Sequence, residues 1–152
     1  MNHSLLKRQI QRLCAQMAFQ QNMNIKVCCR IRGQNEEDKR ALDHSYSFPD
    51  EKSMLHLPSD KVYTFDQIFD QNSSQEQVYN DVARPIVTSV LAGFNGTILA
   101  YGQTSSGKTY TMEGDVSDND KLGIIPRVAH DIFSRTESLD DKTKSEIKVS
   151  IK

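Results

Sequence analysis

The sequence predicts an α/β fold, in which helices flank a mostly parallel central sheet. Three observations predict it. Residues 25–32 alternate apolar and polar side chains, residues 65–96 hold the longest helical pattern, and residues 98–100 form an apolar run that leads through a glycine-bracketed loop into another helix. A helix, a strand, a loop and a second helix in this order describe an α/β sheet with its ligand at the carboxyl end of a strand.

The composition is that of one soluble globular domain. No apolar run among the 152 residues approaches the length of a membrane span, so a membrane protein is not expected. The three cysteines, Cys14, Cys28 and Cys29, suggest no disulfide framework, which favours the cytoplasm. Residues 1–35 carry six basic residues and no acidic one, and because the net charge is -1, the remaining residues carry -7. This acidic main body does not indicate a nucleic-acid partner.

Residues 1–23 are expected to be an N-terminal extension. Helical spacing of four apolar residues predicts an amphipathic helix within it, on Leu6, Ile10, Leu13 and Met17. A membrane-surface helix, an organelle-targeting segment and a partner-docking helix are the functional alternatives. An extension that frays or packs on the domain is favoured over them, because few residues follow the stripe. The main domain is therefore expected at 24–152.

The main domain opens with a strand that ends at Gly33. Three short strands, separated by proline-containing turns, are then expected to form an antiparallel meander, at 46–48, 54–57 and 61–65. The helical pattern that follows has a cap at Ser73 or Ser74 and a stop at Gly93. Pro85 predicts a kink or an irregular first half in this helix. Its apolar stripe is expected to be buried, and consists of Val78, Val82, Ile86 and Val90, joined by Val87 and Leu91.

Beyond the second helix start, residues 114–123 are expected to form an exposed acidic loop. The next helix has Pro126 near its first turn, and its inward face is expected to hold Val128, Ala129, Ile132 and Phe133. His130 is expected at or near the surface. Residues 146–152 alternate again, which predicts a final strand.

Residues 102–109 carry the chemistry of the chain, because Gly102, four intervening residues, then Gly107, Lys108 and Thr109 form the GxxxxGK[ST] pattern of a P-loop. The intervening residues are Gln103, Thr104, Ser105 and Ser106. The glycines let backbone N–H groups approach phosphates, and the following helix N-terminus favours an anion. Lys108 is expected to reach the β- and γ-phosphates and Thr109 to ligate Mg²⁺. The sheet is therefore expected to be of the P-loop NTPase type.

Taken together, these segments resemble the N-terminal part of a kinesin motor domain, and within that family most closely the conventional kinesins. The resemblance covers about residues 24–152, which is rather under half of a motor domain. It is carried by four stretches: NIKVCCRIR, YTFDQIFDQNSSQEQVYNDVA, GFNGTILAYGQTSSGKTYTMEG and GIIPRVAHDIF. The resemblance implies ATP and Mg²⁺ as ligands, with adenine against Arg30, Arg32 and the ring of Tyr110. Gly33 stands where the family has a proline, which removes one apolar contact to the base.

The resemblance also implies an ATP-driven microtubule motor that forms a dimer through a stalk and works on the cytoskeleton in the cytoplasm. The switch I and switch II motifs of that family do not occur in this sequence, so no catalytic residue is assigned, and slow or absent hydrolysis is expected of this chain alone. Open edges of the incomplete sheet are expected to make it marginally stable. Two alternatives remain: a truncated non-motor module for nucleotide binding or interaction, and another P-loop NTPase.

Overall fold

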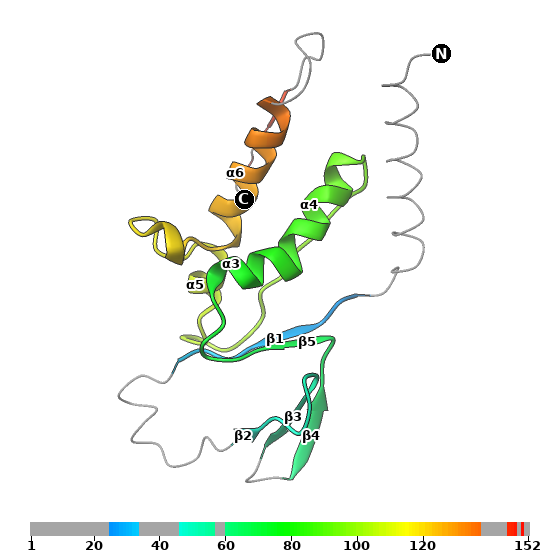
Figure 1. Cartoon of the computed structure of the whole chain (residues 1–152), viewed down its shortest axis with the longest axis vertical. Helices are drawn as coiled ribbons and strands as arrows, with labels where there is room; N and C mark the ends of the chain where they lie inside the picture. Colours follow the sequence, from blue (N-terminus) through cyan, green and yellow to red (C-terminus); the bar gives the residue numbers. More distant parts are fainter. Residues whose placement is uncertain (1–24, 34–45, 57–59, 138–145, 149, 151–152) are drawn as a thin grey trace.

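The computed structural model describes residues 25–33, 46–56, 60–137, 146–148 and 150 (Figure 1). Its strands are β1 (Cys28–Arg30), β2 (Tyr46–Ser47), β3 (Ser53–His56), β4 (Lys61–Thr64) and β5 (Gln67–Phe69). Its helical segments are α3 (Gln75–Val78), the π-helical turn η2 (Tyr79–Ala83), α4 (Arg84–Leu91), α5 (Lys108–Met112), the 3-10 turn η3 (Asn119–Lys121) and α6 (Ile124–Glu137). The helical segments lie together on one side of β1 and β5 in Figure 1. The extension predicted at 1–23 lies outside the described residues.

The described residues form two separate sheets, and the antiparallel one confirms the predicted meander. Strands β2, β3 and β4 pair in that order, and β3 and β4 run antiparallel. The other sheet pairs β1 with β5 in parallel, with Cys29 opposite Ile68. The strand at 67–69 was missed, because its residues fell at the start of the helical pattern. Pairing with β1 decides its conformation: Ile31 N–H donates to the carbonyl of Phe69 at 2.8 Å.

The helix after β5 begins and ends where the sequence predicts. Ser74 Oγ accepts from the backbone N–H of Gln77 at 3.1 Å, and Gly93 lies just beyond the helix with φ of +100°. The predicted irregularity before Pro85 is confirmed as the π turn, in which Arg84 N–H donates to the carbonyl of Tyr79. Proline has no N–H to offer the carbonyl four residues earlier, that of Asp81. Lys26 Nζ donates to that carbonyl instead, at 3.1 Å.

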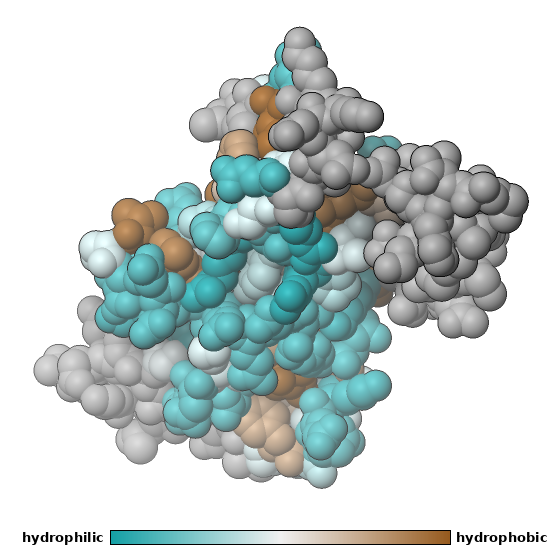
Figure 2. All heavy atoms as spheres, turned by 45° about the horizontal axis from the view of Figure 1, so that its top comes forward, coloured by the Kyte–Doolittle hydropathy of each residue, from teal (hydrophilic) through white to brown (hydrophobic). Residues whose placement is uncertain are grey.

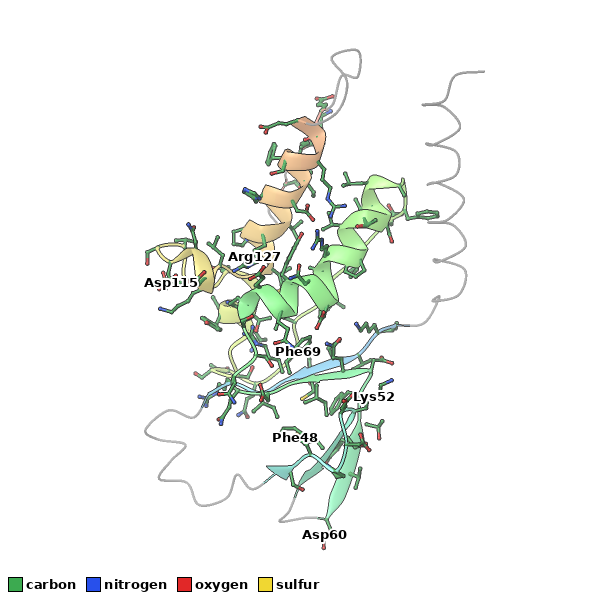
Figure 3. All side chains as sticks on the ribbon, viewed as in Figure 1. Phe48, Lys52, Asp60, Phe69, Asp115 and Arg127 are labelled. Carbon is green, nitrogen blue, oxygen red and sulfur yellow. The ribbon has the colours of Figure 1, made fainter. Side chains whose placement is uncertain are left out.

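The π turn also moves the buried face of this helix. The predicted stripe is confirmed at Val78 and Val87, each 3% exposed, but it is wrong at Val90 and Leu91, which are 39% and 43% exposed. The extra residue of the wide turn changes the phase of the positions around it. Residues adjacent to the stripe are buried in consequence. The core consists of Phe69, Val78, Tyr79, Ala83 and Ile124, with Phe69 on β5 beneath the helices (Figure 3).

Helix α6 contains Pro126 in its first turn, as predicted, and His130 is exposed. Its predicted inward face is only half correct, because Val128 and Ile132 are half-buried while Ala129 and Phe133 are exposed. A network of charged and polar side chains links α6 to the preceding helical segments. Tyr79 Oη donates to Asp131 at 2.5 Å, and Arg135 binds the same carboxylate.

One predicted strand is absent from the part of the chain that the structure describes, and another lies only partly within that part. Residues 98–100 form no strand, and Leu99 within this run and Tyr101 just after it are 88% and 101% exposed. Of the final strand predicted at 146–152, residues 149, 151 and 152 lie outside the described residues, and residues 146–148 and 150 are not in a strand. A strand requires a hydrogen-bonded neighbour for its backbone N–H and C=O groups, and none of the described strands pairs with these segments, although Ile98 packs against the core. Local sequence pattern therefore was not enough to form them.

The visible surface is mainly hydrophilic, with separate hydrophobic patches (Figure 2). The exposed acidic loop predicted at 114–123 is confirmed in part, because it contains η3 and Gly114 makes a β-bridge with Leu122. Arg127 secures this loop by donating to the carbonyls of Leu122 and Asn119 at 2.9 and 3.0 Å (Figure 3). No helix within the described ranges has both the length and the apolar character needed to cross a bilayer.

Candidate nucleotide-binding site

The glycine-bracketed loop turns sharply into α5, which begins at Lys108. Gly107 precedes this helix with φ of +96°, in the left-handed region that glycine adopts at little cost. Ser105 also has a positive φ, +63°, which costs a non-glycine residue about 1 kcal/mol or more and is typical of functional loops. A Cβ atom on Gly102 would lie 2.5 Å from Ser106 Oγ. The loop therefore closes on itself so tightly that a side chain at its first position would displace the Ser106 hydroxyl.

Lys108 folds back over the loop that precedes it. Its Nζ donates to the carbonyl oxygens of Gly102 and Gln103, at 2.8 and 2.6 Å. One backbone bond inside the loop, from Ser106 N–H to the carbonyl of Gln103 at 3.2 Å, makes the turn tighter. Amides in the first turn of a helix have no intrahelical acceptors, and no side chain caps α5. The start of α5 therefore offers N–H groups and an ammonium to an anion.

The loop hydroxyls lie at the surface of this corner. Thr104, Ser105 and Thr109 are exposed, while Ser106 is half-buried. An exposed hydroxyl on the first turn of α5 is the kind of oxygen ligand that Mg²⁺ accepts while retaining several waters. The donor set of the corner fits a magnesium-bound triphosphate: backbone amides, one ammonium and one threonine hydroxyl.

Strand β1 brings Arg30 to the side of α5. The Arg30 guanidinium lies over the ring of Tyr110, with its carbon 5.4 Å from the ring centroid. Nη1 also donates to Gln75 Oε1 at 2.7 Å and to Thr111 Oγ1 at 3.0 Å. Burial lowers the pKa of the guanidinium. The structure thus places Arg30 and Tyr110 together as a cation–π pair beside the loop.

A cavity of about 120 Å³ separates β1 from the loop. Its lining includes Arg30, Arg32, Ser106, Gly107 and Tyr110. Arg32 lies close to the loop backbone, because its Cβ is 3.7 Å from the position that a Cβ on Gly107 would occupy. The residues expected from the sequence to contact a nucleotide, which are far apart in the chain, therefore lie around one corner.

Gln75 is the residue of this region that sequence reasoning missed. It is 4% exposed, and its side chain joins β1, α5 and η3. In the sequence it is one polar residue in the first turn of a helix, where glutamine is usually solvated. Only the packing of α3 against α5 and η3 reveals it.

Known proteins resemble this chain in sequence. The Kinesin motor domain model matches residues 16–152. A kinesin heavy chain of Drosophila melanogaster is 50% identical over 130 residues, which cover 84% of this chain and 13% of that protein. The kinesin-1 heavy chain of Homo sapiens is 49% identical over 135 residues, or 88% of this chain and 14% of that one. The chain thus spans only about a seventh of the length of these relatives.

A solved structure shows that the fold is shared as well. It is described as the structure of a fast kinesin, with implications for ATPase mechanism and interactions with microtubules, and it matches with a TM-score of 0.72 and 34% sequence identity. The match covers 78% of this chain and 34% of that one. The family model, the relatives and the fold lead to one conclusion: the chain belongs to the kinesin motor domain family.

Proposed function

We propose that this chain is the ATP-binding part of a microtubule-based kinesin motor. The single observation that carries the proposal is the corner at 102–109, where a left-handed glycine, open helix amides and Lys108 converge beside the pair of Arg30 and Tyr110. Membership of the kinesin family makes ATP, rather than another anion, the ligand that best fits this corner. The same membership favours a kinesin over an unrelated P-loop NTPase.

The phosphates of ATP belong at the start of α5 in this proposal. Lys108 exchanges its bonds to the carbonyls of Gly102 and Gln103 for the terminal phosphates, and the loop amides from Gln103 to Thr109 surround them. The Thr109 hydroxyl holds Mg²⁺, which supplies neutralisation of phosphate charge when it is bound. Because Lys108 folds back over the loop, its ammonium already lies beside the place proposed for the phosphates.

The nucleobase belongs on the other side of the corner. Tyr110 is 46% exposed, so its ring is available for stacking, and the Arg30 guanidinium fixes the plane of the pair. Arg32 contributes positive charge at the edge of the cavity. Gly33 has no side chain to add to this contact.

The activity of the whole protein is a wider proposal. Relatives named kinesin heavy chain, and a solved kinesin whose title concerns its ATPase and microtubules, support a motor that couples ATP hydrolysis to movement along microtubules. Dimerisation through a stalk and a place on the cytoskeleton in the cytoplasm belong to the same proposal. Microtubule-stimulated phosphate release from the whole protein tests it, and a folded protein without stimulation would favour a non-motor module instead.

Binding of Mg-ATP to this chain, measured by calorimetry, tests the nucleotide site. Lys108→Ala removes the ammonium, and we expect a loss of affinity of about 30-fold or more, because a charge that contacts phosphate contributes several kcal/mol. Lys61→Ala is the matched control, since Lys61 is an exposed lysine of β4, away from the loop. Equal ATP affinity of the Lys108 variant and the wild type would contradict the assignment.

A further inference from the structure

We propose that Gln75 is a positioning residue for the nucleobase side of the site, although it does not line the cavity itself. The inference rests on the proposed function, because it concerns the same site. Gln75 binds both members of the cation–π pair: Oε1 accepts from Arg30 Nη1 at 2.7 Å, and Nε2 donates to the carbonyl of Tyr110 at 2.6 Å. One side chain thereby sets the guanidinium and the backbone that carries the ring.

The Gln75 amide is buried and fully used. Besides those two bonds, Nε2 donates to the carbonyl of Lys121 at 3.0 Å. The side chain is 4% exposed, and it connects β1, α5 and η3, which are distant in sequence. A buried amide with all its partners in place has one stable orientation, because a flip would set two carbonyl oxygens against Oε1 and a guanidinium against Nε2.

Only an amide of this length satisfies the three partners together. A carboxylate would place negative charge against the carbonyls of Tyr110 and Lys121, and methionine of similar size would leave both carbonyls without a donor. The carbonyl of Tyr110 has particular need of one, because α5 has five residues and the last carbonyls of a helix have no intrahelical partner. Gln75 therefore supplies an outside donor at the position where the Tyr110 ring leaves the helix.

The phosphate side does not depend on Gln75. The loop at 102–109 is held by Lys108 and by its own backbone bond, whereas the hydrogen bonds of the Gln75 side chain go to Arg30, Tyr110 and Lys121. A change at Gln75 should therefore weaken ligands that carry a base and leave ligands that carry only phosphates unaffected. A general loss of structure would weaken both classes equally.

The experiment compares the affinities of Mg-ATP and Mg-tripolyphosphate for the wild-type chain, Gln75→Met and Gln75→Asn, with thermal unfolding measured in parallel. The matched control is Gln77→Met, since Gln77 is an exposed glutamine on the same helix. We expect Gln75→Met to lower ATP affinity roughly 5-fold and tripolyphosphate affinity less than about 2-fold. The control is expected to change neither.

The outcomes separate this inference from the proposed function. A wild-type chain that binds neither ligand would overturn the nucleotide site itself. If the wild-type chain binds both ligands, and folded Gln75→Met has the same ratio of ATP affinity to tripolyphosphate affinity, only the role of Gln75 would be overturned. If Gln75→Met unfolds, Gln75→Asn decides, because its shorter amide cannot reach all three partners. If Gln75→Asn keeps the wild-type ratio of ATP affinity to tripolyphosphate affinity, or if both variants unfold, Gln75 serves folding alone and the proposal is overturned.

Discussion

The hydroxyl of Tyr79 joins the π turn to α6, and its removal by Tyr79→Phe has a calculable cost. Tyr79 is 7% exposed and donates to Asp131 Oδ2 at 2.5 Å. A hydrogen bond to a charged group contributes about 1.5–3 kcal/mol, and we expect about 1–2 kcal/mol here because Arg135 continues to satisfy the carboxylate. Arg135 binds it through Nε at 2.7 Å and Nη2 at 2.8 Å. Urea unfolding at pH 7 measures the change.

The pH dependence of the same variant gives a second check. Burial, together with the hydrogen bond to Asp131, raises the pKa of Tyr79 from 10.0 to about 12. The folded state holds this proton more tightly, so the stabilisation is fully present below pH 10 and is lost as the pH rises through 12. Phenylalanine does not titrate, so the advantage of the wild type should shrink above pH 10.

At acid pH the dependence of stability on pH has the opposite sign, because the titrating group is the carboxyl of Asp131. The Arg135 hydrogen bond, with that of Tyr79, holds the pKa of Asp131 below its ordinary value, so its stabilisation is present above that value and lost as the pH falls through the lowered one.

Tyr63→Phe, at a tyrosine that is 45% exposed, is the control for Tyr79→Phe. Equal stability of Tyr79→Phe and the wild type at pH 7, or a difference that stays constant to pH 12, would refute the reasoning.

Three further predictions concern stability. Gly114→Ala should lower the free energy of unfolding by more than about 3 kcal/mol, and Gly93→Ala by only about 1 kcal/mol. Both glycines have a positive φ, but a Cβ on Gly114 would lie 2.1 Å from the carbonyl of Lys121, whereas nothing lies within 4 Å of a Cβ on Gly93. Urea unfolding of the pair should separate them, and equal values would contradict it. Phe69→Ala, at a core residue that is 1% exposed, should lower the free energy of unfolding by about 3–5 kcal/mol and abolish cooperative unfolding. A variant that still unfolds cooperatively would contradict this prediction. Exposed Leu99 should make the melting temperature depend on protein concentration, and a cooperative transition independent of concentration would argue against this.

Features with a local cause were predicted correctly from the sequence. The cap at Ser74, the stop at Gly93 and the disturbance before Pro85 each depend on the chemistry of one residue and its near neighbours. Features that depend on distant partners were not. Strand β5 exists because β1 pairs with it, and the apolar run at 98–100 is no strand because no described strand pairs with it.

The candidate site divides in the same way. The loop at 102–109 is continuous in sequence, so its pattern alone predicted the phosphate side. Arg30 and Tyr110 came only from the resemblance to kinesins, since two residues so far apart give no local signal. Gln75 gave none at all, because its role arises from three elements that meet around one amide.

The central claim is that the corner between 102 and 109 grips the phosphates of ATP with its own backbone. The most direct measurement is the change in backbone amide NMR shifts when Mg-ATP is added to the chain. We predict that the amides from Gln103 to Thr109 shift most, and that amides of the β3–β4 hairpin do not move. Saturation with Mg-ATP that left the loop amides unshifted would contradict the claim.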